Sequence, residues 1–392
     1  MAKTLAARIK TYRREREKTE YFFDYSLLFI VLFLLGFGLV MIYSASSYTA
    51  FQDSGDSAQF MKKQLLAIII GLVAMVVVSL IDYHFWQKFY WIGYAVAAAS
   101  IPVVLTPLGI ASHGARRWFK IPGIGLQVQP AEIAKVCMIL FLAVMVCKIG
   151  KGVGTFRGFV VMMGAPLPIA LMIWKITNNM SSALIVMAIS FLMVFVASPR
   201  YKEFILMGLA GVALAAGVVW YAVYSAGQGT FRLKRIVAWL NPESQAQDTG
   251  FQTLQGLYAI GSGGIWGKGL GQSMQKLKFL PESQNDMIFS IICEELGLFG
   301  AIAVMAMFIM LIWRMMIIAN NAEDLFGAML VVGVIGHIAV QAILNIAVVT
   351  NTIPNTGISL PFISYGGSSV MFLLIEIGLV FSVSRRIQLK DM

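Results

Sequence analysis

Long apolar runs recur along the whole chain, and they constrain its fold more than any other feature. The sequence has 392 residues, of which 59% are hydrophobic and only 12% are charged. A soluble protein carries about twice that charged fraction. Runs of about 20 apolar residues can cross a bilayer as helices. Strands of a membrane barrel alternate apolar and polar residues, and these runs do not. The sequence therefore predicts an all-α polytopic membrane protein.

Ten transmembrane helices are predicted, each of about 20 residues. In chain order the predicted spans are 24–46, 64–82, 88–107, 130–149, 158–176, 180–198, 203–224, 296–318, 325–349 and 366–386. The predicted organisation is a basic cytoplasmic tail (1–23), helices 1–7 (24–224), a large extracytoplasmic catalytic loop (225–295), helices 8–10 (296–386) and a second cytoplasmic tail (387–392).

The orientation follows from the basic N-terminal tail, which holds seven Lys or Arg before residue 20. Such segments stay in the cytoplasm, and an even number of spans then places both termini there. The segment 225–295 falls outside although it carries six basic residues, since long loops cross the membrane regardless of charge. The net charge of +11 suits anionic membrane lipids, and nucleic acid is not an expected partner of a chain without a soluble domain.

The loop 225–295 contains eight glycines between Gly250 and Gly271. One interpretation is an unstructured linker. The apolar residues Phe251, Tyr258 and Trp266 stand among the glycines and favour the alternative, a re-entrant or interface-lying structure. Glycine at this density also lets the backbone approach a ligand closely.

Asp286 is the first candidate for a catalytic acid in this loop, and Glu243, Asp248, Glu282, Glu294 and Glu295 could compete for that role. The competing interpretation of Asp286 is a helix cap, because Asp or Asn before an apolar run often starts a helix. Glu294 and Glu295 lie at the entrance of a span, and we expect them to pair with Lys or Arg. The three cysteines and three histidines are too scattered to predict a disulfide framework or a zinc site.

Two further groups of charged residues precede and enter the fourth span. Arg116 and Arg117 belong to a basic cluster that is predicted to lie outside. Glu132 and Lys135 lie one turn apart on one helix face, and an internal ion pair is one interpretation. Charges within a membrane bundle are costly and usually face a cavity, so we favour cavity lining.

Polar residues also mark the ninth span and the segment after it. His337, Gln341 and Asn345 recur every four residues, a spacing typical of hydrogen bonds between membrane helices. The segment 351–369 contains prolines and a Gly-Gly pair that break helical structure. Broken backbone at membrane depth must lie against protein or water, so this segment is expected to line the same outer cleft as Asp286.

Several long motifs, in order, resemble the SEDS family of shape, elongation, division and sporulation proteins. They are "GARRW", "QPAEIAK", "AIGSGGIWGKGLGQSMQK", "LPESQNDMIFSIICEELG" and "TGISLPFISYGGSS". The resemblance covers nearly the whole chain and is greatest to the FtsW and SpoVE branch. It departs from the family pattern at Asn285, where a threonine is usual, and at 178–182, where an acid is common.

The resemblance implies a peptidoglycan glycosyltransferase that polymerises lipid II into glycan strands during cell division or elongation. It implies Asp286 as the catalytic residue and a class B penicillin-binding protein, a transpeptidase, as partner. It also implies a bacterial cell membrane location, at the division septum. The expected substrate-binding residues are Arg116, Arg117, Glu132, Lys135, Lys276, Glu282, Gln284, Ser364, Tyr365, Gly366, Gly367 and Ser368.

A single carboxylate suffices for this chemistry, because the leaving lipid pyrophosphate needs charge neutralisation more than a proton. Arg or Lys can supply that charge, with or without a divalent cation such as Mg²⁺ or Mn²⁺; no other cofactor is implied. Asp286 would then deprotonate the acceptor hydroxyl. A lipid II flippase and a non-catalytic scaffold for the transpeptidase remain alternatives. A flippase does not need an acid on an outer loop, and many transporters show two matched halves that this sequence lacks.

Overall fold

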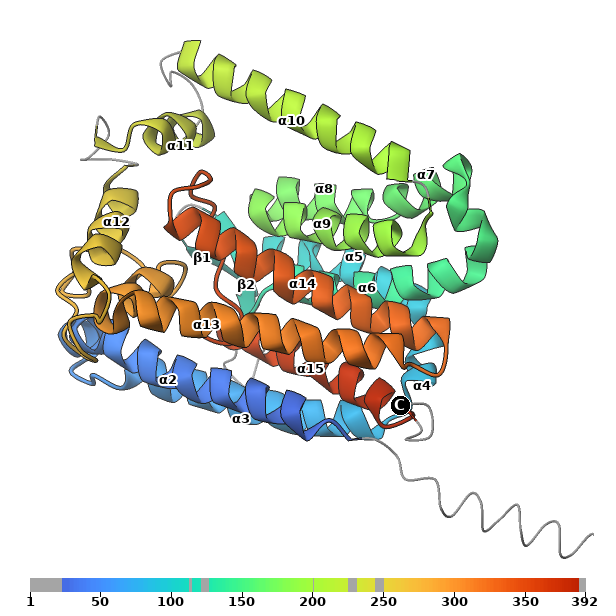
Figure 1. The fold of residues 1–392 in the computed structure, drawn as a ribbon, viewed down its shortest axis with the longest axis horizontal. Coiled ribbons are helices and arrows are strands. Elements are labelled where there is room, and N and C mark those ends of the chain that lie inside the picture. Colours follow the sequence, from blue (N-terminus) through green and yellow to red (C-terminus); the bar gives the residue numbers. More distant parts are fainter. Residues whose placement is uncertain are drawn as a thin grey trace, which may run out of the picture.

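The computed structural model describes residues 23–112, 115–120, 127–199, 201–224, 231–243 and 250–387. Long helices run side by side along one direction (Figure 1). The helices are α2 (Tyr25–Ser54), α3 (Gln59–Leu80), α4 (Tyr83–Gln87), α5 (Tyr90–Ser100), α6 (Pro130–Ile149), α7 (Phe156–Gly164), α8 (Leu167–Thr177), α9 (Met180–Ala197), α10 (Tyr201–Tyr224), α11 (Phe231–Leu240), α12 (Phe251–Gly263), α13 (Ile288–Asn320), α14 (Leu325–Val349) and α15 (Gly367–Ser384).

The helical membrane fold is confirmed. Nine helices of the described chain are long and apolar enough to span a membrane, counting α7 and α8 as one. The predicted span 88–107 corresponds to the shorter apolar helix Tyr90–Leu105, which consists of α5 and the short 3-10 helix Pro102–Leu105. All ten predicted segments are therefore helical, and the exact number of ten crossings stays a prediction.

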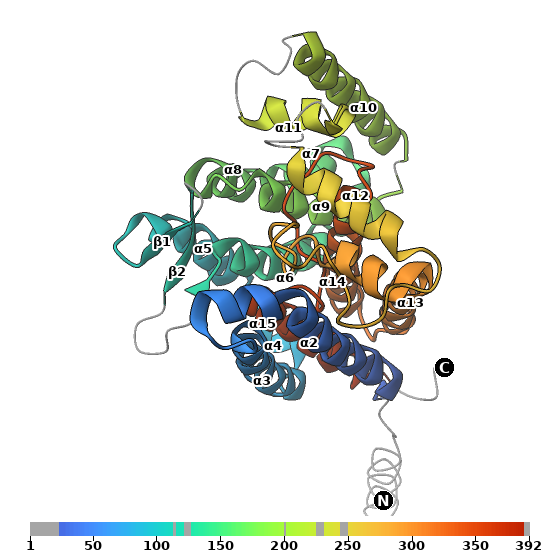
Figure 2. The same ribbon diagram turned by 90° about the vertical axis from the view of Figure 1, so that its left-hand side faces the viewer.

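A small antiparallel sheet, which the sequence analysis did not predict, precedes α6. Its strands are β1 (Gly109–Ser112), β2 (Ala115–Lys120) and β3 (Gln127–Val128), in the order β1-β2-β3. Together with α11 and α12 it lies at one end of the bundle, here called the loop end (Figure 2). The described chain ends, Phe23 and Ile387, lie at the other end, here called the terminal end, where the rings of Phe23 and Phe381 stack 5.1 Å apart.

Close helix packing forms the core, and small residues allow it. At Gly378 of α15, a Cβ atom would lie only 2.7 Å from the carbonyl oxygen of Met75 on α3. Helix α10 is the exception. Only 6% of its apolar stretch is buried against the rest of the protein, and it stands apart from α8 and α9 (Figure 1).

Helix α13 begins eight residues before the predicted span and contains a break. Gly297 has φ 67°, outside helical geometry. The turn after α12 occupies the space beside this break, and the Leu298 amide donates to the Gly264 carbonyl at 2.9 Å. The described parts of 225–295 thus contain helices packed on the bundle, and the linker interpretation is wrong for them.

Candidate functional site

Asp286 lies in the turn that joins the glycine-rich segment to α13. The N-cap of α13 is Met287, and no side chain caps this helix. The capping interpretation of Asp286 is therefore wrong, because its carboxylate accepts no hydrogen bond that caps the first turn of α13. The residue is half-buried at the loop end of the bundle.

Three segments that are distant from Asp286 in sequence meet at this residue. Gln252 of α12 donates from Nε2 to Oδ1 of Asp286 at 3.4 Å, and Asn355 donates to Oε1 of Gln252 at 2.9 Å. Asn345 of α14 donates to the backbone carbonyl of Asp286 at 2.7 Å. A Cβ atom at Gly357 would lie 3.7 Å from Oδ2 of Asp286, so the segment after α14 passes directly beside the carboxylate.

The environment of Asp286 disfavours its ionised form. Burial, reinforced by the negative charge of Glu282, raises the pKa of Asp286 to about 7. The positive charge of Arg235 and the hydrogen bond from Gln252 act in the opposite direction but are weaker. A carboxylate with this pKa is suited to accept a proton near neutral pH.

Arg235 and Gln252 are residues near Asp286 that the sequence analysis did not select. Arg235 lies on α11, and its guanidinium donates to the carbonyl of Asn355 at 3.1 Å. Its sequence signal is the basic run of 231–240, which does not distinguish Arg235 from the other basic residues of the loop. Gln252 had no such signal, because a single uncharged polar residue in a glycine-rich segment does not stand out.

A second set of predicted residues meets next to Asp286. The amide of Tyr365 donates to the carbonyl of Gln284 at 2.9 Å, and Ser364 Oγ accepts from the Leu360 amide at 2.7 Å. Buried Gln64 of α3, which was not predicted, accepts from the Gly366 amide at 3.0 Å. The segment that holds Gly367 and Ser368 therefore begins α15 beside the Asp286 turn.

The predicted pair Glu132 and Lys135 is buried inside the bundle. Lys135 Nζ lies 2.8 Å from Glu132 Oε1, and the two side chains are 2% and 6% exposed, lysine first. Lys135 also donates to Gln341 Oε1 at 3.3 Å. The second oxygen of Glu132, Oε2, has no hydrogen-bond partner among the described residues. The pair thus ties α6 to α14, and its lining of a cavity stays a prediction.

The polar stripe of His337, Gln341 and Asn345 joins helices and loops, as predicted. His337 contacts Glu376 of α15, Gln341 donates to the Ser359 carbonyl at 3.0 Å, and Asn345 donates to the Ile358 carbonyl at 2.7 Å.

The predicted pairing of Glu294 and Glu295 is also confirmed. Lys268 lies 2.7 Å from Glu294, and Lys276 lies 3.1 Å from Glu295. Ser44 of α2 also donates to Glu295 at 2.6 Å. Lys276, predicted to bind substrate, is thus buried in an ion pair that holds the glycine-rich segment on α13 and α2.

The basic cluster is at the loop end but on the opposite flank from α12 (Figure 2). Arg116 and Arg117 belong to β2. Arg116 is exposed and donates to the Leu105 carbonyl at 3.4 Å. Arg117 Nε is buried without a partner among the described residues, and burial lowers the pKa of this guanidinium. No bond of the described residues joins the cluster to Asp286.

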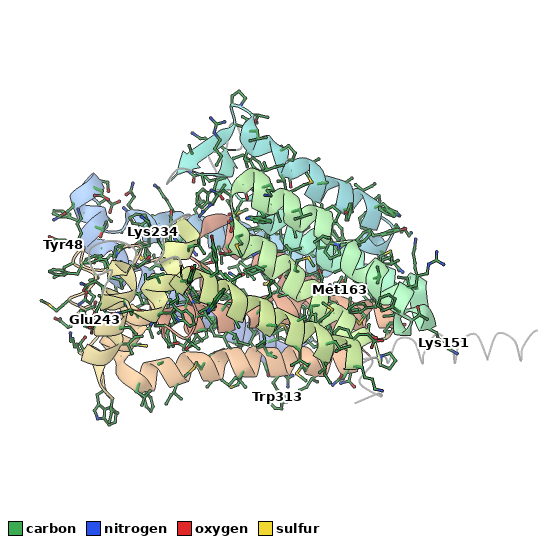
Figure 3. All side chains as sticks on the ribbon, turned by 90° about the horizontal axis from the view of Figure 1, so that it is seen from above. Tyr48, Lys151, Met163, Lys234, Glu243 and Trp313 are labelled. Carbon is green, nitrogen blue, oxygen red and sulfur yellow. The ribbon has the colours of Figure 1, made fainter. Side chains whose placement is uncertain are left out.

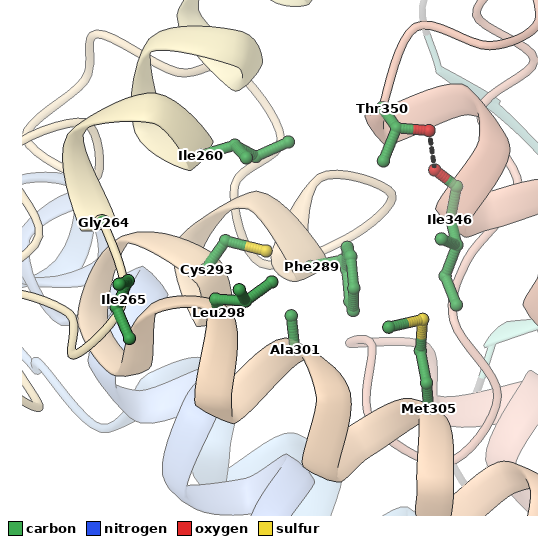
Figure 4. Close-up of a pocket in the computed structure, with 10 residues that line it drawn as sticks. All are labelled: Ile260, Gly264, Ile265, Phe289, Cys293, Leu298, Ala301, Met305, Ile346 and Thr350. Atoms are coloured by element: carbon green, nitrogen blue, oxygen red, sulfur yellow. Dashed lines mark hydrogen bonds between the residues drawn. The ribbon is translucent and has the colours of Figure 1, made fainter.

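An apolar cavity of about 390 Å³ lies between α12, α13 and α14 (Figure 4). Phe289, three residues after Asp286, lines it together with Cys293 and Met305 of α13 and Ile346 of α14. The cavity places hydrocarbon-lined space next to the site. Among the described residues, no group of three or more His, Cys, Asp or Glu could hold a metal ion.

Comparison with known proteins places this arrangement in a family. The model of the cell cycle proteins FtsW, RodA and SpoVE matches residues 25–389. The chain belongs to this family. Stage V sporulation protein E of Bacillus subtilis is 40% identical over 92% of this chain and 97% of that protein. A probable peptidoglycan glycosyltransferase FtsW of Trichlorobacter lovleyi is 38% identical over 94% of each chain.

Solved structures share the fold. A chain from a peptidoglycan synthase complex that coordinates polymerization and crosslinking matches with a TM-score of 0.74 and 24% identity, over 93% of this chain and 98% of that one. Rod shape determining protein RodA of Thermus thermophilus matches with a TM-score of 0.64 and 24% identity, over 93% and 97%. With SpoVE and FtsW relatives at 38–40% identity, the predicted branch of the family is confirmed.

Proposed function

We propose that this family member is a peptidoglycan glycosyltransferase that polymerises lipid II, with Asp286 as the general base. The observation that carries the proposal is the position of Asp286: a carboxylate with a pKa of about 7, held by Gln252 and Asn345 beside an apolar cavity. The relatives named as peptidoglycan glycosyltransferases support the reaction class.

In this mechanism Asp286 takes the proton of the acceptor sugar hydroxyl as that oxygen attacks the anomeric carbon of the donor. The bond from that carbon to the lipid pyrophosphate breaks in the same displacement, so the configuration is inverted. Arg235 is the cation of the described site placed to offset the negative charge of the leaving group. The part of the chain that the structure describes holds no group of three or more His, Cys, Asp or Glu that could bind a metal ion, and no step is assigned to a metal ion.

The remaining roles extend this proposal to the cell. The loop end would face outward, since lipid II reaches Asp286 only on that side, and the termini would be cytoplasmic. A class B penicillin-binding protein would cross-link the strands at the septum, and the fold match to a peptidoglycan synthase complex supports such a partner. Arg116, Arg117 and the segment 364–368 would bind the substrate.

The test is polymerisation of labelled lipid II by the purified chain with its partner, read as glycan ladders. Asp286→Asn removes the base and should lower the rate at least about 100-fold. Asp53→Asn is the matched control, because Asp53 is an exposed acid of the loop end that lies 3.8 Å from Lys278. Ladders from Asp286→Asn at near wild-type rate would exclude Asp286 as the base. If neither the wild type nor the variant makes ladders but the wild type transports lipid II into vesicles, the flippase is favoured.

A further inference from the structure

The buried pair His337 and Glu376 is not used by the mechanism above. Both side chains are fully buried, His337 on α14 and Glu376 on α15. The Nδ1 atom of His337 lies 2.8 Å and 3.0 Å from the two carboxylate oxygens of Glu376. Ionisable residues inside a membrane bundle are costly, and they are usually retained for a function.

The hydrogen bonds around Gln341 define what this pair does. Gln341 Nε2 donates to the Ser359 carbonyl at 3.0 Å, so its Oε1 faces the other way. Oε1 then accepts from His337 Nε2 at 2.8 Å and from Lys135 Nζ at 3.3 Å. His337 must therefore carry a hydrogen on Nε2, and its Nδ1 shares a single proton with Glu376. This arrangement holds the Gln341 amide in one orientation.

One turn further along α14, the stripe reaches the catalytic turn. Asn345 Nδ2 donates to the carbonyls of Asp286 and Ile358, both at 2.7 Å. Gln341 and Asn345 therefore anchor two consecutive residues, Ile358 and Ser359. The residue just before them is Gly357, which passes beside the Asp286 carboxylate.

We propose that His337 and Glu376 are positioning residues for Asp286: they orient Gln341, which with Asn345 holds the segment 357–359 closed over the base. This proposal rests on the proposed function, and neither residue touches the substrate. If the segment loosens, water reaches the Asp286 carboxylate, and desolvation no longer raises its pKa as far.

Four other charged residues lie near Gln341 or near Asp286, and the test leaves all four unchanged. Lys135 and Glu132 of α6 lie on the far side of Gln341 from Ser359. Around Asp286 the charges are Glu282 of the same turn and Arg235 of α11. None of these four residues is altered in the variants below, so a change in the pH profile reports the position of the segment 357–359.

The experiment compares Glu376→Leu with Glu376→Gln in the full chain, assayed for lipid II polymerisation across pH 5 to 9. Glu376→Leu leaves Nδ1 without a partner, and we expect a fall in kcat of about tenfold, the size of one buried hydrogen bond. The acid limb of its pH–rate profile should move to lower pH by at least about half a unit. Glu376→Gln can donate an amide hydrogen to Nδ1. Its kcat should therefore stay within about twofold of the wild type, and its acid limb should stay at the wild-type pH.

Ser382→Ala on the same helix is the matched control, since buried Ser382 donates to the Ile81 carbonyl at 2.6 Å, outside the stripe. It should leave the acid limb in place. Gln341→Leu removes the link to Ser359 and should reproduce the shift of Glu376→Leu, which also keeps the test available if Glu376→Leu does not fold.

Two outcomes would overturn the proposal: an unshifted acid limb in Glu376→Leu or Gln341→Leu, or a Glu376→Gln variant as impaired as Glu376→Leu. Asp286→Asn is assayed in parallel. If it is active, the proposed base itself is wrong; if it is inactive while the limb does not shift, only the positioning role fails.

Discussion

Asp286 differs from its neighbouring acids in its partners. Glu294 and Glu295 each lie within 3.1 Å of a lysine ammonium, whereas the Asp286 carboxylate accepts a hydrogen bond from the neutral amide of Gln252. Two of these three acids thus hold the segment in place, and the third is the one to which the proposed mechanism assigns proton transfer. Their surroundings, and not their residue type, separate these tasks.

At this scale we predict that Glu282→Gln moves the acid limb of the kcat/KM profile to lower pH. Glu282 contributes to the raised pKa of Asp286, so removing its charge lowers that pKa from about 7. The base works in its ionised form, and activity is lost as pH falls through the pKa. A lower pKa therefore preserves activity to lower pH. The check is a pH–rate profile of polymerisation, with the exposed Glu243→Gln as control; a profile identical to wild type would contradict the assignment.

At the scale of elements, the packing of the turn after α12 against α13 depends on one glycine. Gly297 has φ 67°, and a Cβ atom there would lie 2.4 Å from the Gly267 nitrogen and the Ile265 carbonyl oxygen. The break directs the first two turns of α13 toward the Asp286 turn while the rest of the helix crosses the bundle.

Gly297→Ala should destabilise the protein by at least about 1–3 kcal/mol, the cost of a strained backbone, with the overlap adding to it. Gly261→Ala on α12 is the control, because no atom lies within 4 Å of the Cβ it would add. Thermal unfolding in detergent measures both. Equal unfolding temperatures for the two variants would show that α13 can straighten at little cost.

Helix α6 contributes the buried ion pair. Lys135→Ala leaves Glu132 without its cation in the interior, a change that typically costs about 3–5 kcal/mol. We expect it to reduce polymerisation far more than Lys202→Ala, since Lys202 is exposed on α10. The swapped variant Glu132→Lys with Lys135→Glu separates two roles. If it is active where Lys135→Ala is not, the pair is purely structural; if it is also inactive, a role in substrate binding is supported.

For the whole molecule, orientation decides the mechanism. Lys234 and Glu243 lie at the loop end and Lys151 at the terminal end, so the two ends are far apart (Figure 3). In a variant without Cys137, Cys147 and Cys293, cysteine at exposed Gln272 should react with a membrane-impermeant thiol reagent on intact spheroplasts.

Cysteine at Lys151, exposed at the terminal end, should not react until the membrane is opened. Labelling of Lys151→Cys with protection of Gln272→Cys would invert the topology. Asp286 would then lie in the cytoplasm, where flipped lipid II cannot reach it.

The sequence by itself determined the class of fold, because membrane helices must satisfy their own backbone and therefore appear as long apolar runs. It also pointed to Asp286, which the resemblance of its motif to the family singled out among the acids of the loop. The stripe of α14 was visible as well, since regularly spaced polar residues stand out in an apolar helix. The segment 325–349 was predicted with the bounds that α14 has.

Only the tertiary structure decided which groups meet. Gln252 and Asn345 are separated from Asp286 by 34 and 59 positions, and nothing local in their sequence marks them as its neighbours. The segment 351–369 was expected at the same cleft, but its sequence does not show that Gly357 is the residue beside the carboxylate. The same holds for the flank on which Arg116 lies and for the lysines that pair with Glu294 and Glu295. Apolar spacing specifies that a helix crosses the membrane, but the packing of side chains specifies which helix it lies beside, and the pKa of Asp286 depends on that packing.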